Sequence, residues 1–152
     1  MAGRDRVRYV LCEASSSQSF GKGITSEHFL LSFRDRVRSL WGELGLATFG
    51  CSASVVYNFS NFCGVFVVKI PALSTDKCLA AISSMIELSN RSVTVRAIHV
   101  SGRLTNTVRE VQERLLLWRS SVPSQYEVSR RAQLDEMLKA GLASLEKDSG
   151  NL

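Results

Sequence analysis

The run from Phe62 to Ile70 (FCGVFVVKI) is largely apolar on both sides of an extended chain. Successive side chains of a strand point to opposite faces of a sheet, so a strand with one wet face alternates between apolar and polar residues. Within this run only Lys69 is charged, and neither side of the strand is polar throughout. We therefore expect a sheet whose second face is covered, either by a helix of this chain or by a partner chain.

Three further segments have the composition of strands, and segments of helical periodicity separate them. Apolar, mainly β-branched and aromatic residues dominate Arg8–Ala14, Ser52–Phe59 and Ser92–Ser101. Only Ser60-Asn61 separates the second of these from the run 62–70, which predicts a β-hairpin. The predicted order is β-α-β-β-α-β followed by helices. This is an α+β chain in the ferredoxin-like arrangement, with a four-stranded antiparallel sheet and additional C-terminal helices.

The predicted helices carry apolar residues at three- and four-residue steps. The first should begin at Thr25 or Ser26 and stop at Gly45. The second should open at Ser74, and the third at a capping box formed by Thr107 and Glu110. The expected buried residues are Phe29, Phe33, Val37, Leu40, Trp41 and Leu44 in the first helix, Cys78, Leu79, Ile82, Met85 and Ile86 in the second, and Val108, Val111, Leu115 and Trp118 in the third. The third helix is the candidate within the chain for covering the second sheet face.

A change of composition near Pro123 divides the chain. Residues 1–121 are long enough to form one domain with its own core, since the whole chain is 45% hydrophobic. Residues 122–152 are expected to form a C-terminal helical, partly mobile tail, beginning at a second capping box from Ser124 to Glu127.

The positive charge of the chain belongs to its first 121 residues. These carry 15 Lys/Arg against 9 Asp/Glu, whereas residues 122–152 carry 4 against 5, and 14 of the 19 cations are arginine. Guanidinium groups bind phosphate bidentately and stack on bases, so this surplus favours contact with nucleic acid over a solubilising role.

The arginines fall into groups that indicate where such contacts would lie. Arg4, Arg6 and Arg8 alternate into the first strand, so their side chains should project to one side. Arg103 and Arg109 flank the start of the third helix, where free backbone amides also favour phosphate, and Arg114 follows along that helix. Spaced arginines of this kind suit phosphate contact without reading of bases. The predicted RNA-binding residues are therefore Arg4, Arg6, Arg8, Arg103, Arg109 and Arg114; Arg34 and Arg38 are interpreted as ordinary solvated helix residues.

No constellation of catalytic residues can be assembled from the sequence. The two histidines, His28 and His99, lie in different elements, and no nucleophile elbow, P-loop or acidic magnesium cluster is present. The four cysteines include no C-x-x-C pair, so neither a zinc site nor a cofactor is expected. An RNA-recognition motif (RRM) domain is not supported, because only Phe66 and Val67 match the sequence motif of its third strand. Phe66 is expected in the core. The N-terminus lacks the apolar segment of a signal peptide, and no stretch has membrane-spanning length.

The segment RYVLCE at Arg8–Glu13 opens the first strand after a short basic start. The segment AIHVSGRLTNTVREVQERLLLWRSS at Ala97–Ser121 contains a hydrophobic strand, a Ser-Gly turn, a basic residue and a long helix. These two segments resemble the Pop-five (processing-of-precursor) subunit family of ribonuclease P and RNase MRP, and a third, Gly42–Ile70, is similar to the family's central hairpin region. The resemblance covers about residues 7–121, and the loop Ser15–Gly23 and the tail lie outside it.

The resemblance implies a non-catalytic protein subunit of an RNA enzyme. The family's RNA cleaves the 5′ leader from precursor tRNA, and the protein supports that RNA's catalytic domain. The implied partners are ribonuclease P RNA, possibly also MRP RNA, a TIM-barrel protein subunit and other subunits of the complex, with precursor tRNA contacted indirectly and no membrane. Eukaryotic members are nuclear and nucleolar, and the extended tail favours a eukaryotic origin, so the expected location is nucleus and nucleolus.

Two alternatives belong to other classes. A ferredoxin-like dimerising or ligand-binding regulatory module would fit the topology, but it has no need of six excess positive charges in its body. A stand-alone nuclease is disfavoured because an acidic cluster for Mg²⁺ is missing.

Overall fold

The computed structural model describes residues 6–16, 24–60 and 64–121, with Glu136, Lys139, Ala140 and Ala143 of the C-terminal part; the side chains of residues 119–121 are outside that description. The predicted tail from residue 122 lies outside the described residues except for those four, which are helical and exposed. The elements in chain order are β1 (Val7–Ser15), α1 (Ser26–Thr48), η1 (Gly50–Ser52), β2 (Ser54–Phe59), β3 (Val65–Pro71), η2 (Ala72–Ser74), α2 (Thr75–Ser83), β4 (Glu87–Leu88), β5 (Arg91–Ser92), β6 (Thr94–Ser101) and α3 (Leu104–Ser121).

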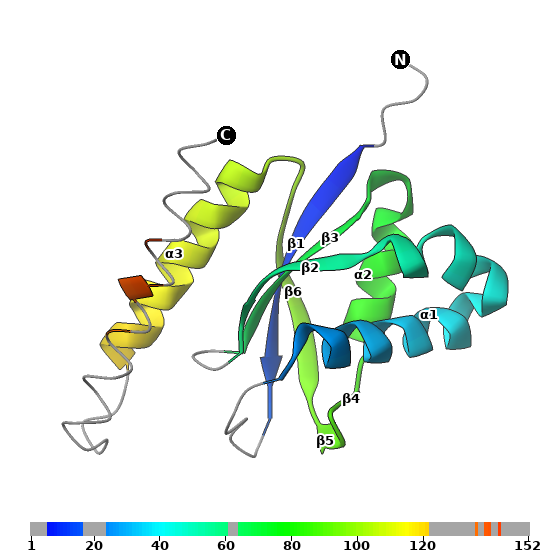
Figure 1. Cartoon of the computed structure of the whole chain (residues 1–152), viewed down its shortest axis with the longest axis horizontal. Coiled ribbons are helices and arrows are strands. Elements are labelled where there is room, and N and C mark those ends of the chain that lie inside the picture. Colours follow the sequence, from blue (N-terminus) through cyan, green and yellow to red (C-terminus); the bar gives the residue numbers. More distant parts are fainter. Residues whose placement is uncertain are drawn as a thin grey trace.

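Four strands form one antiparallel sheet in the order β2-β3-β1-β6, which confirms the predicted four-stranded sheet. The β1–β3 ladder is continuous, with Val10 opposite Val68 and Cys12 opposite Phe66. The predicted hairpin is confirmed by the pairing of β2 with β3. The helices α1, α2 and α3 pack on this sheet. The described part of the chain is therefore a mixed α+β structure with helices on both sides of the sheet (Figure 1).

Each sheet face has its own apolar core. On one face α1 and α2 cover a cluster that includes Phe66, whose ring stacks on that of Phe29 with centroids 4.7 Å apart. On the other face α3 covers Leu11, Val65 and Val67. The α3 residues in this second cluster are Val108, Val111 and Leu115. The prediction of a covered second face is confirmed, and the third helix provides the cover; Trp118, however, is only partly buried.

The first helix begins as predicted but does not end at Gly45. The Thr25 side chain caps it by accepting a hydrogen bond from the His28 N–H at 3.1 Å. The chain is kinked at Gly42, whose φ of 70° and ψ of −168° are not helical, and the helix then continues to Thr48. Gly45 is buried inside it, and a Cβ at this position would lie 2.6 Å from that of Trp41.

The kink also corrects the predicted buried face of this helix. Phe29, Phe33 and Val37 are buried, but Leu40 is 43% and Leu44 76% exposed. A regular 3.6-residue period places all five on one side. Leu44 lies beyond the break at Gly42, which changes the direction of the helix before its last turns, whereas Leu40 lies just before the break.

The second helix and the residues after it also differ from expectation. The helix starts at Thr75, as predicted, but ends at Ser83, and Ile86 is 70% exposed. A short β-hairpin with a two-residue turn follows, in which β4 pairs with β5. Ser89 and Asn90 at its turn both have positive φ, 51° and 65°, as type I′ turns require.

The predicted capping box of the third helix is wrong. The helix begins at Leu104, and Thr107 is fully buried within it, with its hydroxyl donating to the Arg103 carbonyl at 3.4 Å. The helix therefore begins three residues before Thr107. In the preceding turn the Ser101 hydroxyl accepts a hydrogen bond from the Arg103 N–H at 3.1 Å.

Among the described residues, no helix combines the length and the apolar character needed to cross a membrane.

Candidate nucleic-acid interface

Three strand ends meet at one end of the sheet and bring cations together there. Because β1 is antiparallel to both β3 and β6, its first residues lie beside the last residues of those strands. The Arg6 carbonyl accepts a hydrogen bond from the Ala72 N–H at 2.9 Å, and Tyr9 pairs with Lys69 on one side and with Ser101 on the other. We call the four cations gathered in this way the basic end; they are Arg6, Arg8, Lys69 and Arg103.

The guanidinium of Arg8 lies against the turn between β6 and α3. Its Nη1 donates to the Val7 carbonyl at 3.3 Å. Gly102 leaves the space that this group occupies, since a Cβ at Gly102 would be 2.7 Å from Arg8 Nη1. The absent side chain at Gly102 therefore fixes where Arg8 can lie, and it sets Arg8 next to Arg103 in the turn.

A groove of about 910 Å³ opens at the same end of the molecule. Its cationic lining residues are Arg6, Arg8 and Lys69, and Thr48 and Ser52 add hydroxyl groups. None of the described residues that line the groove is Asp or Glu. A concave site lined by cations and no carboxylates focuses a positive electrostatic potential. The groove is therefore suited to an anion that carries several charges.

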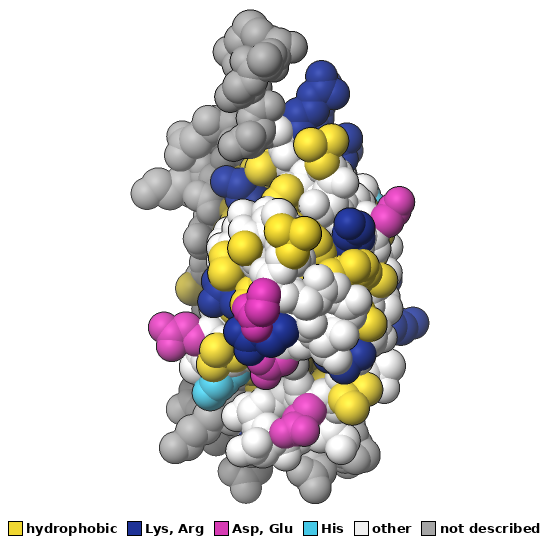
Figure 2. All heavy atoms as spheres, turned by 90° about the vertical axis from the view of Figure 1, so that its right-hand side faces the viewer, with side chains coloured by type: hydrophobic (Ala, Val, Ile, Leu, Met, Phe, Trp, Pro, Cys, Tyr) yellow, Lys and Arg dark blue, Asp and Glu magenta, His cyan; other side chains and the backbone are white. Residues whose placement is uncertain are grey.

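The helical side of the molecule has a different charge pattern. Figure 2 views the side of the molecule that lies on the right of Figure 1 and shows cations, carboxylates and apolar side chains interspersed over it. On α1, Arg38 pairs with Glu43 at 2.9 Å and with Asp35 at 3.9 Å, all three side chains being exposed. The interpretation of Arg38 as an ordinary solvated helix residue is confirmed. Arg34, interpreted in the same way, is instead half-buried, and its Nε donates to the Gly50 carbonyl at 3.4 Å.

A family model matches the chain over residues 8–116, and its description is the Rpp14/Pop5 family. The chain belongs to the Rpp14/Pop5 family. The match covers the four-stranded sheet from Arg8 onward and α3 as far as Leu116, and it includes Lys69 and Arg103. The resemblance found in the sequence segments is thereby confirmed.

A solved structure gives an independent comparison of the fold. The chain is similar to a chain in a cryo-EM structure of yeast ribonuclease MRP, with a TM-score of 0.54, 11% sequence identity, and coverage of 100% of both chains. At this identity the likeness concerns the fold alone. No curated protein sequence matches the chain significantly.

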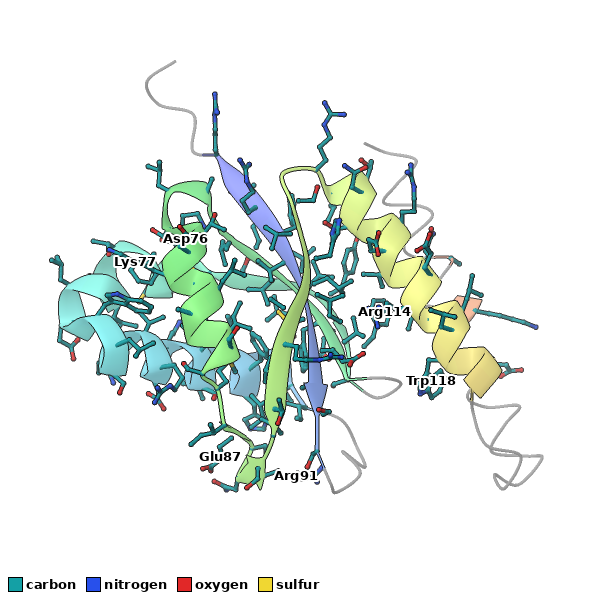
Figure 3. The ribbon with its side chains drawn as sticks, turned by 180° about the vertical axis from the view of Figure 1, so that it is seen from behind. Asp76, Lys77, Glu87, Arg91, Arg114 and Trp118 are labelled. Carbon is teal, nitrogen blue, oxygen red and sulfur yellow. The ribbon has the colours of Figure 1, made fainter. Side chains whose placement is uncertain are left out.

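Of the remaining predicted site residues of this Rpp14/Pop5 chain, the structure separates Arg114 from the basic end. Arg114 lies on α3 (Figure 3), 3.8 Å from a Glu13 carboxylate that also pairs with Arg96 at 2.9 Å. It follows Arg103 by eleven positions, or roughly 16 Å along the helix axis. Arg109 is exposed in α3, and Arg4 lies outside the described residues.

Lys69 is the groove residue that sequence reasoning missed. The sequence does contain a signal, because Lys69 is the single charge in an otherwise apolar strand. Its significance depends on the strand order, which sets the end of β3 beside the start of β1.

The described residues offer little for covalent or metal chemistry. They contain no group of three His, Cys, Asp or Glu side chains placed to hold a metal ion. His99 has a buried Nδ1 without a hydrogen-bond partner, and His28 is exposed on α1. Burial raises the pKa of the Cys12 thiol, and it raises the pKa of the Cys78 thiol to about 12. Both thiols are thus protonated at neutral pH and are poor nucleophiles.

The two buried thiols predict a loss of stability in alkali. In the unfolded chain a cysteine thiol has a pKa near 9, so it ionises at a lower pH than the buried thiol does. The free energy of unfolding therefore falls as the pH rises above about 9, by up to about 1.4 kcal/mol per pH unit for each thiol. Urea unfolding at pH 8 and pH 10 measures this slope. Cys12→Ala should flatten it, whereas Cys51→Ala, which removes an exposed thiol, should leave it as in the wild type. Equal slopes in wild type and Cys12→Ala would contradict the prediction.

Proposed function

We propose that this chain is a non-catalytic protein subunit of ribonuclease P, and of RNase MRP as well, which supports RNA-catalysed 5′ maturation of precursor tRNA and processing of rRNA. The observation that carries the proposal is the family match over residues 8–116. The similarity to a chain of yeast ribonuclease MRP over the full length supports it.

The proposal includes a finer description of the fold. We assign the sheet and the helices α1 and α2 to the ferredoxin-like class, with the β4–β5 hairpin as an insertion and α3 as an addition that covers the second face. The order β-α-β-β-α-β of the main elements supports this assignment. We also propose that residues 1–121 form the RNA-associated domain and that residues 122–152 form a separate tail.

The proposed partners are ribonuclease P RNA, MRP RNA, a TIM-barrel protein subunit and other subunits of the same complex, in the nucleus and nucleolus. The proposed RNA-binding residues remain Arg4, Arg6, Arg8, Arg103, Arg109 and Arg114. The basic end supports three of them: Arg6 and Arg8 line a groove without carboxylates among its described lining, and Arg103 follows Gly102, against which the Arg8 guanidinium lies. A regulatory module that binds a small metabolite or dimerises has no need of such a site, so the proposal favours RNA.

The purified protein alone is expected not to cleave precursor tRNA, because the proposed activity resides in RNA. The assay incubates full-length protein with precursor tRNA and Mg²⁺ and maps the 5′ end of the product. The native complex, purified through a tag on this chain, should cleave the same substrate at the mature 5′ end and should lose that activity after nuclease removes its RNA. Cleavage by the protein without RNA, or a native complex that contains no RNA, would overturn the proposed function.

A further inference from the structure

We propose that the groove at the basic end binds the backbone phosphates of RNA, with Arg8 and Lys69 as contact residues and Gly102 as the residue that positions Arg8. This inference rests on the proposed function, because the polyanion is taken to be the RNA of the same complex. It adds three things to that function: a defined binding site, Lys69 as a contact residue besides the arginines predicted from the sequence, and Gly102 as the residue that leaves space for the Arg8 guanidinium.

The first argument is the pairing state of the cations. Within the described part of the chain, Arg38, Arg96 and Arg114 each lie within 4 Å of a carboxylate oxygen. The described structure contains no such ion pair for Arg6, Arg8 or Lys69. Cations that line a concave surface without a carboxylate are stabilised when an anion enters, and a chain of phosphates supplies several charges at once.

The second argument is the chemistry of the groove wall. Besides its cations and hydroxyls, the described lining consists of aliphatic and backbone surface and includes no aromatic ring. Recognition of unpaired RNA bases depends on aromatic or planar stacking partners, while positioning contacts to phosphate and sugar depend on Arg, Lys and hydroxyl groups. The groove therefore fits the backbone and not a splayed base.

The third argument is the placement of Arg8 by Gly102. The Arg8 side chain occupies the space over Gly102 that a Cβ would fill, at 2.7 Å from Nη1. Gly102 is not one of the glycines with positive φ, so alanine is compatible with its backbone. Gly102→Ala should displace the guanidinium, the flexible end of a side chain, without changing the net charge or unfolding the protein.

The test measures binding of full-length protein to the RNA that copurifies with the native complex, transcribed in vitro. Arg8→Gln and Lys69→Gln should each weaken binding by about tenfold at fixed salt. Each should also reduce the slope of log K against log salt by about one unit. Arg91→Gln is the matched control, because it removes the same charge at the β4–β5 hairpin, which lies at the opposite end of the sheet from the start of β1 (Figure 3). It should leave both affinity and slope unchanged.

Gly102→Ala supplies a test that does not alter charge. It should weaken RNA binding in the wild-type background and have no further effect when Arg8 is already glutamine, and the thermal midpoint of unfolding should stay as in the wild type. Equal losses from Gly102→Ala in both backgrounds would overturn the positioning role.

Other outcomes separate this inference from the proposed function. If the wild type binds the RNA but Arg8→Gln and Lys69→Gln behave like Arg91→Gln, the groove is not the RNA site and the proposed function stands. If these variants lose affinity for a polyglutamate peptide but not for RNA, the groove binds an acidic protein segment and the inference is overturned. If no RNA copurifies with the chain, both proposals fail.

Discussion

Replacing Leu115 by alanine is expected to lower the free energy of unfolding by about 2–5 kcal/mol. Leu115 is fully buried between α3 and the second sheet face, in the cluster that contains Leu11, Val65 and Val67. Removing its side chain leaves a cavity in the apolar contact between α3 and the sheet. Since small domains are stable by only about 5–15 kcal/mol in total, this is a large share of the margin.

Leu116→Ala is the matched control for this prediction. Leu116 is the next residue of the same helix, has the same side chain, and is 50% exposed. Its replacement should change stability by less than about 1 kcal/mol, because half of its surface stays in contact with water in the folded protein. Chemical unfolding of both variants, followed by far-ultraviolet circular dichroism, gives the comparison. Similar losses for the two variants would mean that α3 does not cover the sheet in solution.

Phe66→Ala is expected to cost about 3–5 kcal/mol, the largest effect of a single substitution that we predict. Phe66 is fully buried on the face covered by α1 and α2, and its ring stacks on Phe29. A double-mutant cycle with Phe29→Leu should detect a coupling of about 0.5–1.5 kcal/mol for the aromatic pair. Additive losses would contradict the stacked geometry.

Phe66→Leu separates this structural role from RNA recognition. Leucine keeps most of the apolar volume, so the cost should be below about 1.5 kcal/mol and the protein should stay folded. RNA affinity should equal that of the wild type, because the ring of Phe66 faces the helices and is unavailable to a base. A folded Phe66→Leu variant with weakened RNA binding would restore the hypothesis of an RRM-type stacking surface.

Most of the core could be predicted from apolar periodicity, because burial selects side chains at fixed spacings. Phe29, Phe33 and Val37 follow the helical period and are buried. Leu44 follows the same period but is 76% exposed, because it lies beyond the backbone break at Gly42. A periodicity argument assumes a straight helix, and a single glycine with positive φ removes that assumption.

Capping patterns predicted one helix start correctly and misplaced another. Thr25 accepts the His28 N–H, as a threonine before a helix should, and that start is correct. Thr107 and Glu110 have the spacing of a capping box, but Thr107 is instead a buried residue within α3. Both patterns look alike in sequence, because short-range spacing does not record which turn of a helix packs on the sheet.

The sequence by itself determined that the second face of the sheet must be covered, that the chain alternates strands and helices, and that its positive charge lies in the first 121 residues. Only the tertiary structure decided that α3 is the cover for the second face and that the groove joins Arg8 to Lys69. The physical reason is that hydrophobic and charge patterns are local along the chain, whereas the basic end depends on strand order. Arg8, Lys69 and Gly102 are far apart in sequence, and antiparallel pairing of β1 with both β3 and β6 brings them together.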